Sequence, residues 1–114
     1  MQRTVLALCA GLLIAQPAAA NFLTYAEWVR MKPDMRAIYV AGAYDALITF
    51  AMSDEQRAVN AHYSNCITRS KMTVAQLAES VRQYAKGKPN LQDYVETPLI
   101  NYLYAFCGAP PRGN

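Results

Sequence analysis

Residues 39–50 have the pattern of the middle of a long helix, where small and large apolar side chains surround a single acid, Asp45. Spacings of three and four bring five positions to one helix face: Met35, Tyr39, Gly42, Ala46 and Phe50. Glycine inside a helix costs about 1 kcal/mol relative to alanine. We therefore expect a second helix to cross close to the backbone at Gly42, and we expect this central helix to organise the fold.

A short helix is predicted ahead of the central one. Thr24 and Glu27 have the spacing of a capping box, and Leu23 and Trp28 occupy the two positions of a hydrophobic staple. This helix should end at residue 32, because the residue before Pro33 disfavours helical geometry. Pro33 suits the first turn of the central helix, which we run to about residue 52.

The stretch after the central helix is more polar. Ser53 and Gln56 repeat the capping-box spacing, which predicts new helical turns over residues 54–62 or a kinked continuation. Residues 60–70 carry Asn, Ser and Thr without a clear period, so we expect most of them to form a loop that contains Cys66.

Two further helices are predicted towards the C-terminus. Thr73 and Gln76 form a third capping-box pattern, and Gly87 followed by Pro89 is typical of a helix end. A turn or short helix is expected at residues 91–96 and a longer helix at residues 98–106. One face of this region should carry Leu91, Val95, Pro98, Tyr102 and Phe106.

No segment alternates with a period of two, so the sequence predicts an all-α fold. The expected architecture is a small single-domain bundle of four to five helices over residues 21–108, followed by a flexible tail at residues 109–114.

Residues 1–20 have the pattern of a secretory signal peptide. Arg3 supplies the positive start, an apolar run follows, and Ala18 to Ala20 form a cleavage site. A retained N-terminal anchor and a lipid-modified Cys9 are the alternatives. We expect cleavage after Ala20, export to the periplasm, and no stable membrane insertion of the remaining chain.

Removal of the signal peptide leaves two cysteines, Cys66 and Cys107. An even pair in an exported chain favours a disulfide, and two free thiols are the alternative. A bond that closes a loop of about forty residues stabilises the fold by roughly 4 kcal/mol in the chain-entropy model.

Composition and motifs do not indicate an enzyme. Ten basic and eight acidic residues remain after cleavage, and the basic ones are scattered, so no nucleic-acid stripe is predicted. A single histidine, His62, and two paired cysteines do not make a nucleophilic pair or a zinc site. No phosphate-binding loop or nucleophile elbow is present. We expect no catalytic residue, no metal and no cofactor.

Asp45 and the tyrosines are the unusual side chains. A carboxylate on an apolar helix is costly to bury unless it is paired. We expect Asp45 to bond to an amide, a tyrosine hydroxyl or an arginine of the fold, and contact with a partner protein is the alternative. Eight tyrosines suit half-buried helix faces and binding surfaces alike. Tyr102 and Tyr104 point in directions about 200° apart, so at least one should be exposed.

The order of these features resembles the Tai/Rap family of type VI secretion immunity proteins. The pattern consists of an exported helical chain, Gly42-x-x-Asp45-Ala46 after Tyr39, then Cys66, then Gln76-Leu77, and a last helix that ends in Cys107-Gly108. The resemblance covers most of residues 22–107. It implies an all-helical periplasmic protein, often a homodimer, that binds and blocks a peptidoglycan amidase toxin.

The expected function is therefore binding of a protein partner. Candidate contacts lie in the polar stretch after the central helix: Asp54, Glu55, Arg57, His62 and Tyr63. The alternative is a small periplasmic chaperone of the acid-stress type, which is similar in size and helical build.

Overall fold

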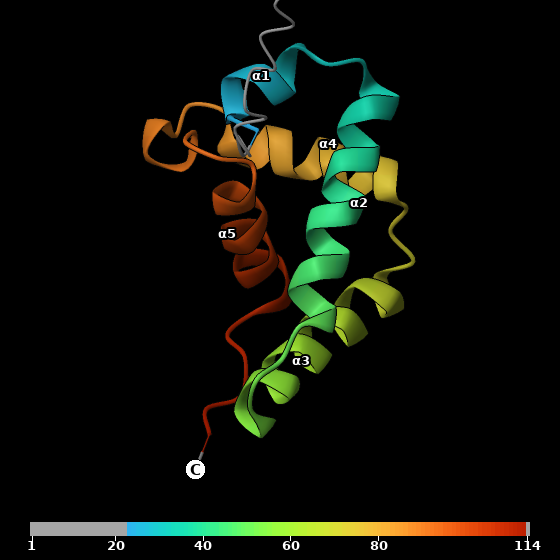
Figure 1. The fold of residues 1–114 in the computed structure, drawn as a ribbon, viewed down its shortest axis with the longest axis vertical. Helices are drawn as coiled ribbons and strands as arrows, with labels where there is room; N and C mark the ends of the chain where they lie inside the picture. Colours follow the sequence, from blue (N-terminus) through green and yellow to red (C-terminus); the bar gives the residue numbers. More distant parts are fainter. Residues whose placement is uncertain (1–22, 114) are drawn as a thin grey trace, which may run out of the picture.

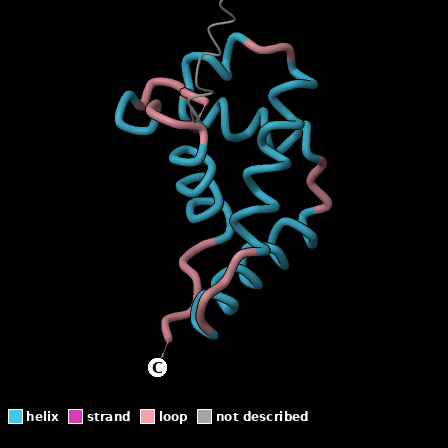
Figure 2. Tube along the Cα trace, viewed as in Figure 1, coloured by secondary structure: helices cyan, strands magenta, loops and turns pink. Residues whose placement is uncertain are grey.

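The computed structural model describes residues 23–113, which form five α-helices, one short 3-10 helix and no strand (Figures 1 and 2). The all-α prediction is confirmed. The expected signal peptide at residues 1–20 lies outside the described residues. The bounds are α1 (Tyr25–Arg30), α2 (Pro33–Thr49), α3 (Asp54–Ser70), α4 (Val74–Ala85), η1 (Pro89–Leu91) and α5 (Glu96–Cys107).

Helix α2 is the axis against which the other long helices pack. It makes its most extensive contact with α4, which runs across it, and it also contacts α3 and α5 (Figure 1). Helix α5 contacts both α4 and α3, so the four long helices share one core. The buried set of that core is Tyr25, Trp28, Ala37, Val40, Ile67, Leu77, Ala78, Val81, Ala85, Val95, Leu99 and Leu103.

Helix α1 closes one end of this core. The capping box between Thr24 and Glu27 is present as predicted, and it fixes where the helix begins. The Trp28 side chain is fully buried, and its indole Nε1 donates to the Arg36 carbonyl of α2 at 3.2 Å. The Tyr25 hydroxyl donates to the Arg82 carbonyl of α4 at 3.3 Å. Although α1 has only six residues, it therefore connects α2 to α4.

The face of α2 that we expected inside is mostly outside. Ala37 and Val40 are buried, whereas Met35 is 46 % exposed and Phe50 is 69 % exposed. Apolar residues occur on all sides of α2, so their period could not identify the inward face. Gly42 is exposed, and a Cβ placed there would meet nothing within 4 Å. The predicted helix crossing at Gly42 is wrong. The helix also ends at Thr49, before the expected residue 52.

The loop expected at residues 60–70 is wrong as well, because α3 is one continuous helix of 17 residues. Asn60 hid the helical period, since a buried amide stands where an apolar residue was expected. Its Nδ2 donates to the Phe50 carbonyl at 2.8 Å, and its Oδ1 accepts from Gln56 Nε2 at 2.9 Å. Ser53 caps the Gln56 amide, but the Gln56 side chain turns to Asn60, so the capping box is only half formed.

The C-terminal half follows the prediction more closely. The capping box of Thr73 and Gln76 opens α4, and Gly87 has a positive φ of 75° just beyond its end. Helix α5 begins at Glu96, two residues earlier than expected, with Pro98 buried in its first turn. Its inward face carries Leu99 and Leu103. The expected positions Tyr102 and Phe106 lie beside this face: Tyr102 is half-buried and stacks with Phe106, which is exposed.

The predicted disulfide is present between Cys66 and Cys107. It joins the C-terminal part of α3 to the last residue of α5, whereas we had expected it to start from a loop. Residues 109–113 form no helix or strand. Gly113 lies beside the Glu55 side chain, so the end of the described chain runs back along α3 (Figure 1).

Replacing Gly42 by alanine should raise the free energy of unfolding by about 1 kcal/mol, because the new methyl group meets open space and alanine is the better helix former. Urea unfolding followed by circular dichroism measures this. Ala46→Gly, on the same exposed face, is the matched control and should lower stability by a similar amount. A destabilised Gly42→Ala variant would show that the space around Gly42 is not open.

The double substitution Cys66→Ser, Cys107→Ser should lower the free energy of unfolding by roughly 4 kcal/mol, because the unfolded chain then gains the entropy of an open loop. The oxidised and reduced wild-type proteins, compared in the same urea titration, provide the control without any substitution. Equal stability of the two forms would show that the bond does not constrain the unfolded state.

Candidate functional site

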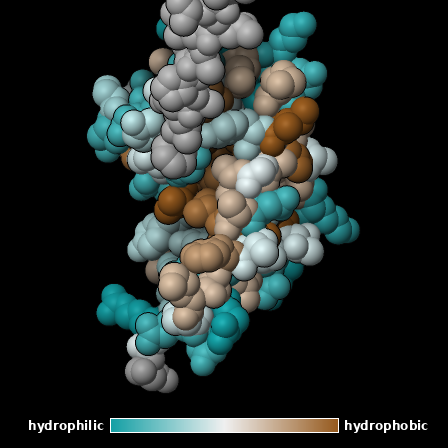
Figure 3. Space-filling model, in the orientation of Figure 1, coloured by the Kyte–Doolittle hydropathy of each residue, from teal (hydrophilic) through white to brown (hydrophobic). Residues whose placement is uncertain are grey.

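A surface groove with apolar walls lies between α2, α3 and α5. It has a volume of about 220 Å³, and its main apolar walls are Leu47, Val59, Tyr63, Ile100 and Leu103. A second hollow of about 330 Å³ continues it past Leu47 and Gln56, which line both, to Ala46, Phe50 and Met52. We call the two together the α2–α5 groove. Figure 3 shows hydrophobic residues gathered at the centre of this face, between α5 and α2.

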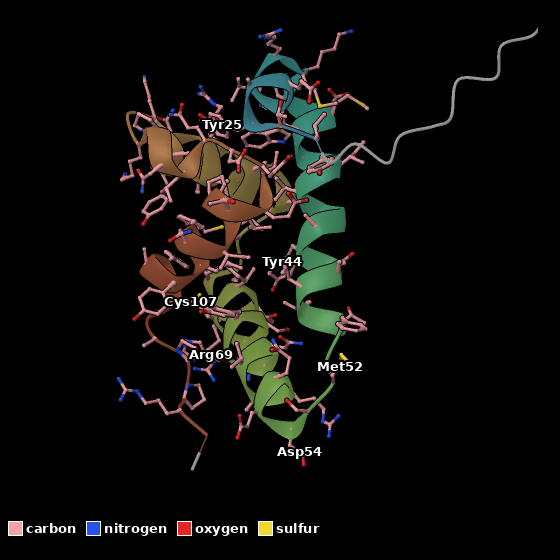
Figure 4. All side chains as sticks on the ribbon, turned by 60° about the vertical axis from the view of Figure 1, so that its left-hand side comes forward. Tyr25, Tyr44, Met52, Asp54, Arg69 and Cys107 are labelled. Atoms are coloured by element: carbon pink, nitrogen blue, oxygen red, sulfur yellow. A yellow bond between two sulfur atoms is a disulfide. The ribbon has the colours of Figure 1, made fainter. Side chains whose placement is uncertain are left out.

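Several large apolar side chains at the groove are open to solvent. Met52 is 85 % exposed, Phe50 is 69 % exposed and Ile100 is 46 % exposed. Met52 lies at the turn between α2 and α3, two residues before Asp54 at the start of α3 (Figure 4). Contiguous exposed apolar surface on a small protein is typical of an interaction site. The rim is polar where Ser53 and Gln56 line it, at the start of α3.

Tyr63 lines the groove and carries a polar group. It is half-buried, and desolvation, aided by Tyr104, raises the pKa of its phenol, which therefore stays protonated at neutral pH. Among residues 23–113 its hydroxyl has no hydrogen-bond partner. A tyrosine with an apolar ring in the wall and a free hydroxyl is suited to orient a bound protein segment.

The predicted contact residues are spread over three sides of α3. Tyr63 alone lines the groove. Asp54, Glu55 and Arg57 lie exposed on the first turn, where Arg57 pairs with Asp54. His62 lies on another side, with Nε2 3.0 Å from the Gly108 carbonyl oxygen. The structure therefore does not bring these five residues together.

A separate polar hollow of about 430 Å³ surrounds the disulfide and includes His62, Cys66, Arg69 and Cys107. Arg69 of α3 and Cys107 of α5 lie on the same side of the molecule in Figure 4. The His62 contact holds the residue that follows Cys107 against α3.

The Gly42-x-x-Asp45-Ala46 motif lies on the exposed surface of α2. Ala46 lines the α2–α5 groove. The Asp45 carboxylate makes no hydrogen bond or ion pair with the described residues, so the fold partner that we expected for it is not present there. Tyr104 is 55 % exposed, which agrees with the expectation that one of the two tyrosines of α5 faces solvent.

No group of three or more His, Cys, Asp or Glu side chains within residues 23–113 is placed to hold a metal ion. No helix in that part of the chain is both long enough and apolar enough to cross a membrane. Comparison with protein-family models, with curated proteins and with solved structures found no match to this chain.

Sequence reasoning missed most of the groove. Leu47, Met52 and Ile100 belong to three segments that only the folded chain brings together. One signal was available, because Phe50 and Met52 lie within the three residues before Ser53, which caps α3. Large apolar residues at a helix-to-helix turn have few neighbours along the chain that could bury them.

An ion pair that changes the pKa of its acid lies away from the groove, on α4. The Arg82 guanidinium and the Gln83 amide donate to Glu79, and together they lower the pKa of its carboxyl to about 2. The hydrogen bonds that Thr24 donates likewise lower the pKa of Glu27. These two acids stay ionised well into the acid range.

The contribution of Glu79 to stability should be present above its ordinary pKa of 4.5 and should be lost as the pH falls towards about 2. Glu79→Gln should therefore lower the free energy of unfolding at pH 7 by at most about 1 kcal/mol, as is usual for an exposed pair. At pH 2 the variant and the wild type should be equally stable. Asp93→Asn, at an exposed acid without an ion pair among the described residues, is the control. A Glu79 effect that persists unchanged at pH 2 would contradict this assignment.

Proposed function

We propose that this chain is an exported protein-binding domain of the immunity type, which docks a peptidoglycan amidase toxin on the α2–α5 groove and blocks its active site. The observation that carries the proposal is the contiguous apolar surface of the groove, from Met52 and Phe50 to Ile100. The resemblance of the motif order to the Tai/Rap immunity proteins supplies the class of partner. Export to the periplasm is part of the proposal and rests on the pattern of residues 1–20.

The groove has the parts that a protein interface requires. Leu47 and Leu103 form an apolar floor, Phe50 and Ile100 stand out as anchors, and polar residues form the rim. The free Tyr63 hydroxyl provides a directional bond within the apolar wall. The acidic first turn of α3, with Asp54 and Glu55, lies next to Met52 and favours a partner surface with basic residues around an apolar centre.

The same exposed side chains favour one second function, a periplasmic chaperone of the acid-stress type that binds unfolded clients. Such a protein should bind denatured clients without a fixed partner and should expose more apolar surface in acid. The immunity proposal instead requires one folded partner and a binding surface that is already formed at neutral pH.

Replacing Ile100 by aspartate should weaken binding of the amidase at least tenfold, because an exposed apolar anchor worth about 1.5–3 kcal/mol is lost and a charge is buried. Tagged protein is used to capture a cell-wall hydrolase from a periplasmic extract. Affinity and inhibition of peptidoglycan digestion are then measured with the purified hydrolase.

Ile38→Asp is the matched control. Ile38 is exposed like Ile100, but it lies on α2, on a side of that helix away from Leu47 and Phe50. It should bind like the wild type. The immunity function is refuted by failure to capture or inhibit any cell-wall hydrolase. It is also refuted by suppression of client aggregation that increases reversibly at acid pH. Equal binding of the hydrolase by Ile100→Asp and Ile38→Asp would refute the groove as the docking surface.

A further inference from the structure

A second cleft lies between α2, α3 and the first turn of α4. Its volume is about 400 Å³, which is within the range of small-molecule sites. On α2 it is bordered by Ala41, Tyr44, Asp45 and Ile48, which recur at helical spacing. Leu47 and Phe50, which line the α2–α5 groove, project on another side of α2. Ile48 is the one residue that lines both the cleft and the α2–α5 groove. The cleft is thus a separate site.

The floor of the cleft is apolar and consists of residues that belong to the hydrophobic core. Ile67 of α3 is 8 % exposed and Leu77 of α4 is 3 % exposed, and both line the cleft. Met72 and Val74, from the connection between α3 and α4, add further apolar wall. An apolar side chain of a ligand could therefore be shielded from water against this floor.

Two side chains of opposite charge line the cleft and do not form an ion pair with each other. Asp45 and Lys71 both line it and are both exposed. Neither side chain forms an ion pair or a hydrogen bond with any residue of the described range 23–113, and they do not pair with one another. Lys71 is held in a left-handed conformation, φ 56°, at the C-cap of α3, so its backbone position is fixed. The two charges are consequently available to a ligand.

Hydroxyl groups complete the lining. Tyr44 extends from α2 towards the other helices (Figure 4), and burial raises the pKa of its phenol, which a side-chain hydrogen bond with Ser64 partly opposes. Thr68 stands one turn before Lys71 on the same helix and offers a further donor and acceptor. The cleft thus combines one anion, one cation, several hydroxyls and an apolar floor.

This combination selects a particular ligand chemistry. A simple cation would be attracted by Asp45 and repelled by Lys71, and a simple anion would meet the reverse. A zwitterion can pair with both charges at once, and an apolar side chain on it would pack against the floor of the cleft. We propose that the α2–α3–α4 cleft binds a small zwitterion with an apolar side chain, of the size of a hydrophobic amino acid. Its ammonium pairs with Asp45 and its carboxylate pairs with Lys71. This proposal does not depend on the proposed docking of an amidase.

The test is titration of the ¹⁵N-labelled protein with L-phenylalanine, monitored by amide chemical shifts. Saturable shifts are expected in residues 41–48 and 64–77, and not along α5. Two probes share the phenyl group but carry one charge each: 2-phenylethylamine and 3-phenylpropionate. Each should bind at least tenfold more weakly, because one charge-assisted bond is lost. Absence of saturable shifts with phenylalanine, or equal binding of a singly charged probe, would overturn the proposal.

Substitutions provide the second half of the experiment. Asp45→Asn and Lys71→Asn should each weaken phenylalanine binding about tenfold. Asparagine tolerates the left-handed backbone at residue 71, and both sites are exposed, so the variants should fold. Asp93→Asn and Lys86→Gln remove exposed charges elsewhere and should bind like the wild type. Unchanged affinity in both cleft variants would overturn the assignment of the two charges, even if phenylalanine binds.

Discussion

The complete burial of Trp28 is the constraint on which the arrangement of the helices depends. An indole buries a large apolar area, but its N–H must find an acceptor when it leaves water. Here that acceptor is the Arg36 carbonyl, so the first turn of α2 has to lie beside α1. Tyr25 adds a second link, through its hydroxyl to α4 and through its backbone amide to the Asp93 carbonyl ahead of α5. A helix of only six residues thus determines where three other elements can lie.

This anchoring also selects the inward side of α2. With its first turn fixed beside Trp28, the helix turns Ala37 and Val40 into the core and leaves Met35, Ile38 and Phe50 in solvent. Those side chains are apolar, and their exposure to water is unfavourable in free energy. A binding partner that covers them would remove this penalty. The exposed apolar side chains of α2 are therefore a consequence of the core, and Phe50, just beyond the end of that helix, is the one of the three that lines the α2–α5 groove.

Helix α3 gives the molecule two usable depressions, one on each flank. Its buried line, Asn60 and Ile67, packs inward, and the disulfide at Cys66 fixes its distance from α5. One flank, with Val59 and Tyr63, closes the apolar groove, and the other approaches the charges of Asp45 and Lys71. The first depression suits a protein surface, whereas the second has the charge pattern of a small zwitterion site. The two can be occupied independently because they share only Ile48 among their lining residues.

Local chemistry could be predicted from the sequence by itself. The capping boxes at Thr24 and Thr73, the stop at Gly87, the all-α class and the pairing of the two cysteines depend on neighbours along the chain or on simple counting, and the structure confirms them. The inward face of α2 could not be predicted, because a helix that is apolar all round has no preferred side until its partners are present. The helical state of residues 60–70 was hidden for a related reason, since Asn60 is acceptable in the core only because the Phe50 carbonyl lies next to it. The same holds for both proposed binding sites, whose walls come from three helices each. Tertiary structure alone decided which exposed residues would meet, because that depends on how Trp28 and the disulfide set the helices against one another.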